Sequence, residues 1–292
     1  MKALVTGGAG FIGSQICEAL CKRGASVLVL DNLSTGDEKN LAWAGNGDDL
    51  EFVKGSVGDN ALINKLVQGC DWVFHEAAQP SVPLSVEKPV ETNRDNLDAS
   101  LELLVASRDA GVKRFMFASS SAVYGNSVAP VKQESDKPDP ISPYGLQKFA
   151  SERYGQMFYD LYGFETISFR YFNVFGPRQA FDSPYSGVIA KFCTVMLAGQ
   201  APKIFGDGDQ SRDFVYVENV VNANLLAAEG AKEKVAGRVF NVGCGSSINL
   251  LQLAAELNKL TNQSLEPQHE PPRVGDIKHS QADISAAIEG LG

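Results

Sequence analysis

The sequence has few of the features that would point to a membrane, a nucleic acid or a metal ion. Its 292 residues include no apolar run of about 18 residues, so no transmembrane helix is expected. The formal net charge is -9, and an acidic surface repels a phosphate backbone, so no nucleic-acid partner is expected. His75, His269 and His279 lack metal-ligand spacing, and we therefore expect no metal site.

Cysteine is also scarce, and it follows no pattern. The chain has five cysteines and no Cys-x-x-Cys motif: Cys17, Cys21, Cys70, Cys193 and Cys244. Such a set favours small buried apolar side chains in a reducing compartment, so a cytoplasmic location is expected. The apolar stretch from Met1 to Thr6 gives way at once to Gly7-Gly8 without a cleavage-site pattern. It is interpreted as a buried first strand rather than a signal segment.

Short apolar runs alternate with amphipathic stretches through the first part of the chain. The runs expected to form strands are Ala3–Thr6, Val27–Leu30, Glu51–Val53, Trp72–Phe74, Phe115–Ala118 and Thr166–Phe169. The clearest helical patterns are Ile12–Arg23, Asn93–Ala110 and Pro143–Tyr162. This alternation predicts an α/β fold with a doubly wound parallel sheet covered by helices on both faces.

The pattern loosens after Phe172, where turn signals such as Gly176-Pro177 become frequent. We therefore predict a first domain over residues 1–172 and a smaller α/β lobe over residues 173–292. A strand and helix over Phe214–Ala228 and a strand over Val239–Val242 are expected to pack back onto the first domain.

A glycine-rich turn follows the first predicted strand and opens the first predicted helix. Gly7, Gly10 and Gly13 stand three residues apart. They allow a tight turn, a close approach of backbone to a pyrophosphate, and close helix packing on the sheet. The free N–H groups and positive dipole at the helix start favour phosphate binding. Because a strand precedes the turn and a helix follows, the motif predicts a dinucleotide site.

Asp31 ends the second predicted strand, at the distance from the glycines expected for a residue that binds ribose. Its carboxylate can accept hydrogen bonds from the adenosine ribose hydroxyls and would repel a 2′-phosphate. Asn32 and Leu33 follow, without an arginine. The sequence therefore favours NAD over NADP as the cofactor.

A serine run and a Tyr-x-x-x-Lys pair form the candidate catalytic set. Ser119, Ser120 and Ser121 follow the Phe115–Ala118 strand, and Tyr144 and Lys148 lie at i and i+4 near the start of a helix. An ammonium and a positively charged nicotinamide would favour the phenolate of Tyr144, which could take a hydroxyl proton while hydride leaves the same carbon. Each of these features is common in proteins when it occurs alone. The glycine turn, the acidic strand end, the serine run and the Tyr-x-x-x-Lys pair occurring in this order are what indicate a catalytic site.

In these motifs the chain resembles the extended short-chain dehydrogenase/reductase family, specifically its NAD-dependent epimerase/dehydratase group. The resemblance also includes Arg170-Tyr171-Phe172-Asn173, Ser211-Arg212-Asp213-Phe214 and Pro271-Pro272-Arg273. It implies a Rossmann fold, NAD as cofactor and a UDP-sugar as substrate. It also implies Tyr144 as base, Lys148 as the residue that fixes the nicotinamide ribose and lowers the tyrosine pKa, and Ser120 as the residue that aligns the sugar hydroxyl.

The resemblance further implies two sets of binding residues. The cofactor set is Gly7, Gly10, Phe11, Ile12, Gly13, Asp31, Asn32, Ser34, Thr35, Gly36, Ser56, Val57, Ala77, Ala78, Gln79, Asn93, Ser119, Tyr144, Lys148 and Phe172. The substrate set is Ser81, Val82, Ser120, Ser121, Asn173, Val188, Phe205, Arg212, Arg273, Asp276 and Ser280. Arg212 and Arg273 would supply the local positive charge that an acidic protein needs to bind a diphosphate.

The chain departs from the group at two places. Gly55-Ser56-Val57 stands where relatives have Gly-Asp-Ile, so a shorter, uncharged contact to adenine is expected. The sequence ends at Gly292 where relatives continue into further helix, which leaves open whether the C-terminus is complete.

The residues after the aligning serine bear on the reaction. Dehydratases and decarboxylases of the group carry acidic residues there, whereas Ser121 and Ala122 do no acid–base work at neutral pH. The expected reaction is therefore 4-epimerisation of a UDP-hexose, UDP-Glc/UDP-Gal, through a 4-keto sugar. Alternatives that stay open are a UDP-glucuronate 4-epimerase, a nucleotide-sugar dehydratase or 4-ketoreductase, and a non-catalytic nucleotide-binding regulator.

Two finer expectations rest on the resemblance alone. It places Ser280 beside the C2 substituent of the hexose, where a serine leaves room for the N-acetyl group of UDP-GlcNAc/UDP-GalNAc. It also implies a homodimer formed through about Asn93–Ala110 and Tyr144–Tyr162. Leu97, Leu101, Leu104 and Val105 have helical spacing in the first of these stretches, which an ordinary core-facing helix explains equally well.

Overall fold

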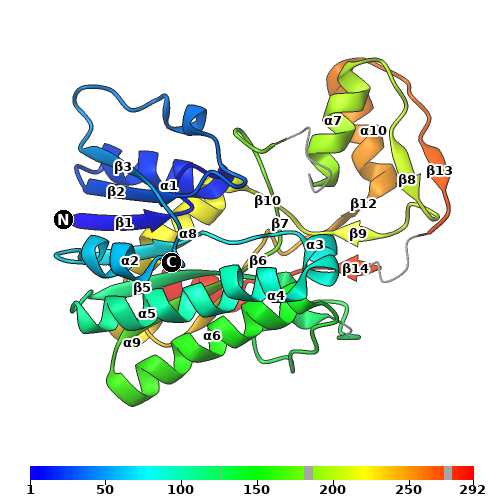
Figure 1. The fold of residues 1–292 in the computed structure, drawn as a ribbon. Coiled ribbons are helices and arrows are strands. Elements are labelled where there is room, and N and C mark those ends of the chain that lie inside the picture. The colour runs from blue at the N-terminus through cyan, green and yellow to red at the C-terminus, as the bar shows by residue number, and fades with distance from the viewer. Residues whose placement is uncertain (126, 181–186, 273–277) are drawn as a thin grey trace.

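Seven parallel strands form the central sheet, with helices on both faces and a group of shorter elements beyond their carboxyl ends (Figure 1). The computed structural model describes residues 1–125, 127–180, 187–272 and 278–292. The strands are β1 (Lys2–Thr6), β2 (Ser26–Asp31), β3 (Leu50–Lys54), β4 (Trp72–His75), β5 (Arg114–Ser120), β6 (Glu165–Tyr171) and β11 (Val239–Val242). Their order is β11-β6-β5-β4-β1-β2-β3, so the direction of winding reverses between β1 and β4. The predicted doubly wound α/β fold is confirmed.

Each face of the sheet has its own apolar core. On one face lie α1 (Phe11–Lys22), α8 (Val217–Glu229) and α11 (Ser285–Leu291). On the other lie α2 (Asn60–Leu66), α5 (Ala99–Asp109) and α6 (Pro143–Tyr162). Because helices cover both faces, the central strands are buried throughout, which explains why they appear in the sequence as continuous apolar runs.

Helix α6 has the bounds that the sequence predicted. The Ser142 hydroxyl caps it by accepting from the Gly145 N–H at 3.1 Å, and Pro143 occupies the first turn. It ends at Gly163, whose φ of 68° lies in the left-handed region that glycine adopts readily. These local signals fix where Tyr144 and Lys148 stand on the helix.

The stretch predicted to be helical over Asn93–Ala110 is helical, but it contains a π turn that the sequence did not predict. The segment is divided into α4 (Pro89–Asn93), a π-helical turn η2 (Arg94–Asp98) and α5. A π turn carries more residues than an α turn, so it changes which side chains face the sheet. Asn96, within this turn, is fully buried, whereas Asn93 is only half-buried.

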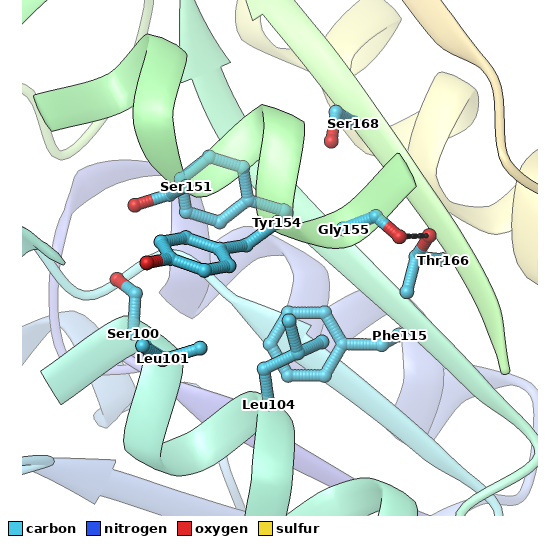
Figure 2. Close-up of a pocket in the computed structure, with 10 residues that line it drawn as sticks. Ser100, Leu101, Leu104, Phe115, Ser151, Tyr154, Gly155, Thr166 and Ser168 are labelled. Atoms are coloured by element: carbon cyan, nitrogen blue, oxygen red, sulfur yellow. Dashed lines mark hydrogen bonds between the residues drawn. The ribbon is translucent and has the colours of Figure 1, made fainter. Parts of the chain in front are cut away.

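Helices α5 and α6 pack closely against each other and against β5 and β6. Figure 2 shows the crevice between them, with the Tyr154 ring, Leu101 and Leu104 around it. Its volume of about 10 Å³ is that of a single water at most. Leu104 is buried here and Leu101 is half-buried, so part of the expected apolar stripe serves the core of this chain.

The shorter elements form small sheets beyond the central one (Figure 1). The strands are β7 (Asn173–Phe175) paired with β10 (Phe214–Tyr216), β9 (Ser211–Arg212) between β12 (Ile248–Asn249) and β14 (His279–Ser280), and β8 (Lys203–Phe205) paired with β13 (Gln268–Glu270). Helices α7 (Val188–Leu197) and α10 (Leu250–Thr261) pack around Phe192, Met196, Ile204 and Leu253.

The remaining elements are short: η1 (Glu38–Leu41), α3 (Val82–Glu87), η3 (Ser121–Tyr124) and α9 (Lys232–Val235). The strand and helix expected over Phe214–Ala228 correspond to β10 and α8, and β11 has its predicted bounds. The division of the chain at residue 172 stays a prediction. Within the described ranges, no helix is both long enough and apolar enough to cross a bilayer.

Candidate active site

The glycine turn lies where winding reverses, at the end of β1. Gly7 has a φ of 68°, and a Cβ there would lie 2.6 Å from the backbone nitrogen of Ala77. A Cβ on Gly13 would strike the carbonyl of Gly7. The backbone is therefore packed as tightly as only glycine permits, and the start of α1 stays open to a pyrophosphate. The structure accordingly fits a dinucleotide at this position.

Asp31 is held at the rim of the same turn. One carboxylate oxygen accepts the Ala9 N–H at 3.0 Å and the other accepts the Leu33 N–H at 2.8 Å. The side chain is 7% exposed, so its direction is fixed before any ligand arrives. Carboxylate oxygens have further lone pairs, which remain free to accept from ribose hydroxyls.

The other residues predicted to bind cofactor lie around this turn at the carboxyl ends of the strands. Phe11 and Ile12 start α1, and Asn32, Ser34, Thr35 and Gly36 follow β2. Ser56 and Val57 follow β3, and Ala77, Ala78 and Gln79 follow β4. The Ser56 hydroxyl accepts from the Gly58 N–H at 3.1 Å, so it already takes part in its own turn.

Two predicted cofactor residues have their side chains turned into the protein. The Ser119 hydroxyl donates to the buried carboxylate of Glu152 at 3.0 Å, and Glu152 pairs with Arg170 at 2.7 Å. Phe172 is buried against the Tyr124 ring, with their centroids 6.2 Å apart. Any role for Ser119 toward a cofactor would therefore involve its backbone.

The three candidate catalytic side chains meet at the end of β5. Ser120 ends the strand, and its hydroxyl lies close enough to the Tyr144 phenol to lower the phenol's pKa. A Cβ on Gly145 would lie 2.7 Å from the Ala122 carbonyl, so the glycine lets α6 approach η3 closely. The Lys148 ammonium, on the same helix, donates to the Ala118 carbonyl at 2.7 Å. The structure thus brings together the three residues that the sequence selected.

The electrostatics of this trio differ from the sequence expectation. Burial raises the pKa of Tyr144, and the nearby Ser120 hydroxyl offsets only part of that effect. Burial also lowers the pKa of Lys148 to about 8, although the carboxyl of Glu76 opposes this shift. The Lys148 ammonium donates to the Ala118 carbonyl, and the pKa of Tyr144 stays above its ordinary value. Positive charge from a bound ligand is therefore needed to favour the phenolate of Tyr144.

The predicted substrate residues lie on short elements outside the central sheet. Ser81 caps α3, where Val82 is 40% exposed, and Ser121 begins η3. Asn173 starts β7, Val188 starts α7, Phe205 ends β8, and Arg212 and Ser280 are aligned partners in β9 and β14. Arg273 and Asp276 lie outside the described residues. Within the described parts of the chain, no group of three or more His, Cys, Asp or Glu side chains could hold a metal ion.

A family model described as "NAD dependent epimerase/dehydratase family" matches residues 3–243. The chain belongs to this family. The resemblance expected from the sequence motifs is confirmed, and the dinucleotide turn, the Ser120–Tyr144–Lys148 trio and the reversed sheet order all lie within the matched residues.

Named relatives in this epimerase/dehydratase family are similar over nearly the whole chain. UDP-glucose 4-epimerase of Mycolicibacterium smegmatis is 39% identical over 100% of this chain and 93% of its own length. The solved structure of UDP-N-acetylglucosamine 4-epimerase from Methanobrevibacter ruminantium, in complex with UDP-N-acetylmuramic acid, is 42% identical with a TM-score of 0.94, covering 99% of this chain and 91% of that one. UDP-glucose 4-epimerase from Thermotoga maritima, solved with UDP-glucose, is 41% identical with a TM-score of 0.93, covering 100% and 93%.

In this member of the epimerase/dehydratase family, the asparagine that faces the strand ends is Asn96, which the sequence analysis did not select. Its side chain accepts the Gln79 N–H at 2.7 Å and donates to the Gln147 side chain at 2.8 Å. Asn93, which was selected, donates to the exposed Asp98 at 3.2 Å. The π turn accounts for the difference, because it turns Asn96 toward the loop after β4.

Asp213 is a second residue whose structural role the sequence analysis missed. Its buried carboxylate accepts backbone N–H groups of Cys244 at 2.7 Å, Gly245 at 3.1 Å and Ala282 at 3.1 Å. Its own N–H donates to the Ser280 carbonyl at 2.7 Å, and its carbonyl accepts the Asn173 N–H at 3.1 Å. One residue therefore joins the segments that carry Asn173, Arg212 and Ser280.

Proposed function

We propose that this protein is an NAD-dependent UDP-hexose 4-epimerase, an isomerase acting on UDP-Glc/UDP-Gal through a 4-keto sugar. The observation that carries the proposal is the buried trio of Ser120, Tyr144 and Lys148 at the end of β5, followed by Ser121 and Ala122. That set supports proton transfer at one hydroxyl and supplies no acid for elimination at the neighbouring positions. The names of the similar proteins agree with it.

NAD would be held by the glycine turn, Asp31 and the loops after β3 and β4. When bound, it accepts hydride from C4 of the sugar and returns it to the other face. The tight packing at Gly7 and Gly13 supports this assignment, because side chains there would collide with neighbouring backbone. The oriented carboxylate of Asp31 supports NAD rather than NADP.

The protein's own groups handle the proton. Tyr144 takes the proton of the C4 hydroxyl as hydride departs, and gives it back when hydride returns. Ser120 orients that hydroxyl, because its own hydroxyl lies close to the phenol of Tyr144. Lys148 is held between the Ala118 carbonyl at 2.7 Å and the Phe117 ring at 4.8 Å, so it has little freedom to turn away from the reacting carbon.

The nucleotide end of the substrate is assigned to the shorter elements. Arg212, Asn173, Val188 and Phe205, together with Arg273 and Asp276, would hold the diphosphate and uridine. Ser280, aligned with Arg212 and 9% exposed, would lie beside the C2 substituent of the sugar. The small side chain supports acceptance of UDP-GlcNAc/UDP-GalNAc as well as the plain hexoses.

We also propose that two copies pair through α5 and α6, and that the enzyme works in the cytoplasm. Exposed apolar side chains on α6 support the pairing: Leu161 is 66% exposed and Tyr162 is 55% exposed, with the Arg108 guanidinium of α5 lying 4.6 Å from the Tyr162 ring. All five cysteines are free thiols, which suits a reducing compartment. Light scattering coupled to size-exclusion chromatography tests the dimer.

The deciding experiment follows the anomeric protons by NMR, without added reductant. Purified protein is incubated separately with UDP-Glc, UDP-GlcNAc and UDP-GlcA. Galacto-configured signals growing to an equilibrium mixture would establish a 4-epimerase and identify its sugar. A signal with UDP-GlcA alone would identify the glucuronate epimerase, and consumption of NAD(P)H in step with product would identify a 4-ketoreductase. No change with any sugar, even with NAD added, would contradict the proposal and favour a non-catalytic binder.

A further inference from the structure

Glu76, the first residue after β4, is an acidic side chain that the proposed proton transfer does not use. Its carboxylate accepts the Tyr171 hydroxyl at 2.9 Å, and the Asn224 side chain donates to that same hydroxyl at 2.7 Å. The side chain is half-buried. No ion pair joins Glu76 to a cation within the described residues, so its direct stabilising contact is the hydrogen bond from Tyr171.

The position of Glu76 follows from the order of the strands. Strand β4 lies between β1, which leads into the glycine turn, and β5, which leads to Ser120. A Cβ on Gly7 would lie 2.9 Å from the carbonyl carbon of Glu76, so the backbone of Glu76 contacts that turn. A dinucleotide that begins at α1 and reaches Tyr144 must therefore cross the end of β4.

Glu76 also interacts electrostatically with the catalytic pair. The Lys148 ammonium acts to lower the pKa of Glu76, and the Glu76 carboxyl raises the pKa of Tyr144. Glu76 is thus close enough for its charge to be felt where hydride and proton are exchanged. Neither group neutralises it by direct contact.

The charge of Glu76 changes close to neutral pH. The dense protein around it raises the pKa of Glu76 to about 7, against the hydrogen bond from Tyr171 and the charge of Lys148. The groups that face it are Tyr171 from β6, uncharged Asn224 from α8, and Lys148 and Tyr144 from α6. Its neighbour His75 is neutral in this range, since burial lowers the pKa of His75 to about 3.

We propose that the Glu76 carboxylate favours the oxidised, positively charged nicotinamide over the reduced, neutral one. A negative charge stabilises the cation by Coulomb attraction and leaves the neutral ring almost unaffected. An epimerase returns its hydride to the sugar in every cycle and uses no outside oxidant. An enzyme molecule left with reduced cofactor would therefore be inactive, and a residue that stabilises the oxidised cofactor makes that outcome rarer. The inference depends on the proposed use of NAD and extends it to a residue beyond the proton-transfer trio.

The test compares the binding of the two cofactor forms. The full-length protein is equilibrated with a fixed mixture of NAD⁺ and NADH at several pH values between 6 and 8. Free nucleotide is removed rapidly, and the bound ratio is measured after denaturing release. For the wild type, we expect the bound NAD⁺:NADH ratio to rise roughly tenfold as pH increases through the titration of Glu76. For Glu76→Gln, we expect a lower ratio that changes much less with pH, because Lys148, with a pKa of about 8, is then the remaining group near the cofactor whose charge changes in this range.

Two further variants separate charge from structure. Tyr171→Phe removes the hydrogen bond that lowers the pKa of Glu76, so the rise in the ratio should move to higher pH while its size is retained. Glu91→Gln, which removes an exposed acid paired with Lys88 at 3.5 Å, should behave as the wild type. Equal loss of both nucleotide forms in Glu76→Gln, or a wild-type ratio independent of pH, would overturn the inference. Failure of the wild type to bind either nucleotide would instead contradict the proposed use of NAD, so the two failures are distinguishable.

Discussion

The two halves of the candidate site are built in different ways. On the cofactor side, side chains follow directly after long, buried parallel strands, and sheet register sets their spacing. On the substrate side, the strands have only two or three residues, and the carboxylate of Asp213 joins three separate segments. On the cofactor side, a functional side chain should therefore be replaceable with little effect on the stability of the fold. On the substrate side, the same hydrogen bonds position the side chains and stabilise the fold, so a substitution should affect both.

The sharpest test of separability is Tyr144→Phe, which removes only the phenolic oxygen. We expect kcat to fall about 10³-fold, because the proton acceptor is lost while the ring still fills its site. Binding of NAD and of the UDP-sugar, measured by calorimetry, should stay close to that of the wild type. Tyr154→Phe on the same helix is the matched control and should retain turnover. A large loss of binding in Tyr144→Phe would show that chemistry and scaffold are not separable on this side either.

The matching test on the substrate side is Asp213→Ala. Three backbone N–H groups would lose their acceptor, so we expect a loss of about 3 kcal/mol in the free energy of unfolding. We also expect the KM for the UDP-sugar to rise at least tenfold, since the segment of Ala282, two residues after Ser280, loses its side-chain anchor beside Arg212. Denaturant titration and initial-rate kinetics measure the two effects.

Asp209→Ala, an exposed acid four residues away, is the control for Asp213→Ala and should change neither quantity by much. Affinity for NAD should be nearly unchanged in both variants. If Asp213→Ala lowered stability without raising KM, the carboxylate would be a structural residue with no bearing on the substrate.

The sequence predicted the cofactor side of the site better than the substrate side. Gly7, Gly10 and Gly13 are contiguous with the strand and helix that they join, so their role could be recognised locally. Tyr144 and Lys148 stand on a helix whose cap and end are both encoded beside it, and its bounds were predicted correctly.

What the sequence did not reveal depends on contacts between distant residues. The Asp213 carboxylate binds partners 31 and 69 residues away, and no local sequence pattern predicts such hydrogen bonds. The spacing of apolar residues also does not predict the π turn before α5. Asn93 was therefore predicted to bind the cofactor, whereas Asn96 is the asparagine whose side chain is turned inward. Two polar bonds, to Gln79 and Gln147, decide that orientation, and both partners are remote in sequence.

A smaller change sharpens the comparison at the proposed substrate pocket. Ser280→Tyr would place a bulky ring beside Arg212, where Ser280 is now almost fully buried. We expect kcat/KM for UDP-GlcNAc to fall about tenfold, because overfilling a packed site is costly, and activity on UDP-Glc to fall less. Ser280→Ala should leave both substrates nearly unaffected. Full activity of Ser280→Tyr on the N-acetylated sugar would remove Ser280 from the specificity pocket.

The smallest expected effect compares two histidines, one in each half. His75 is buried between Thr6 and Ser100, with hydrogen bonds of 2.7 and 2.8 Å, and burial lowers its pKa to about 3. The unfolded chain takes up a proton on His75 near pH 6.5, whereas the folded chain does so only near pH 3. The stability from neutral His75 is therefore complete above about pH 6.5 and is lost as pH falls. Between pH 6 and pH 5 we expect the wild type to lose about 1 kcal/mol more than His75→Gln. His279→Gln, at an exposed position in β14, should follow the wild type; equal slopes for all three proteins would show that His75 is not held neutral by the fold.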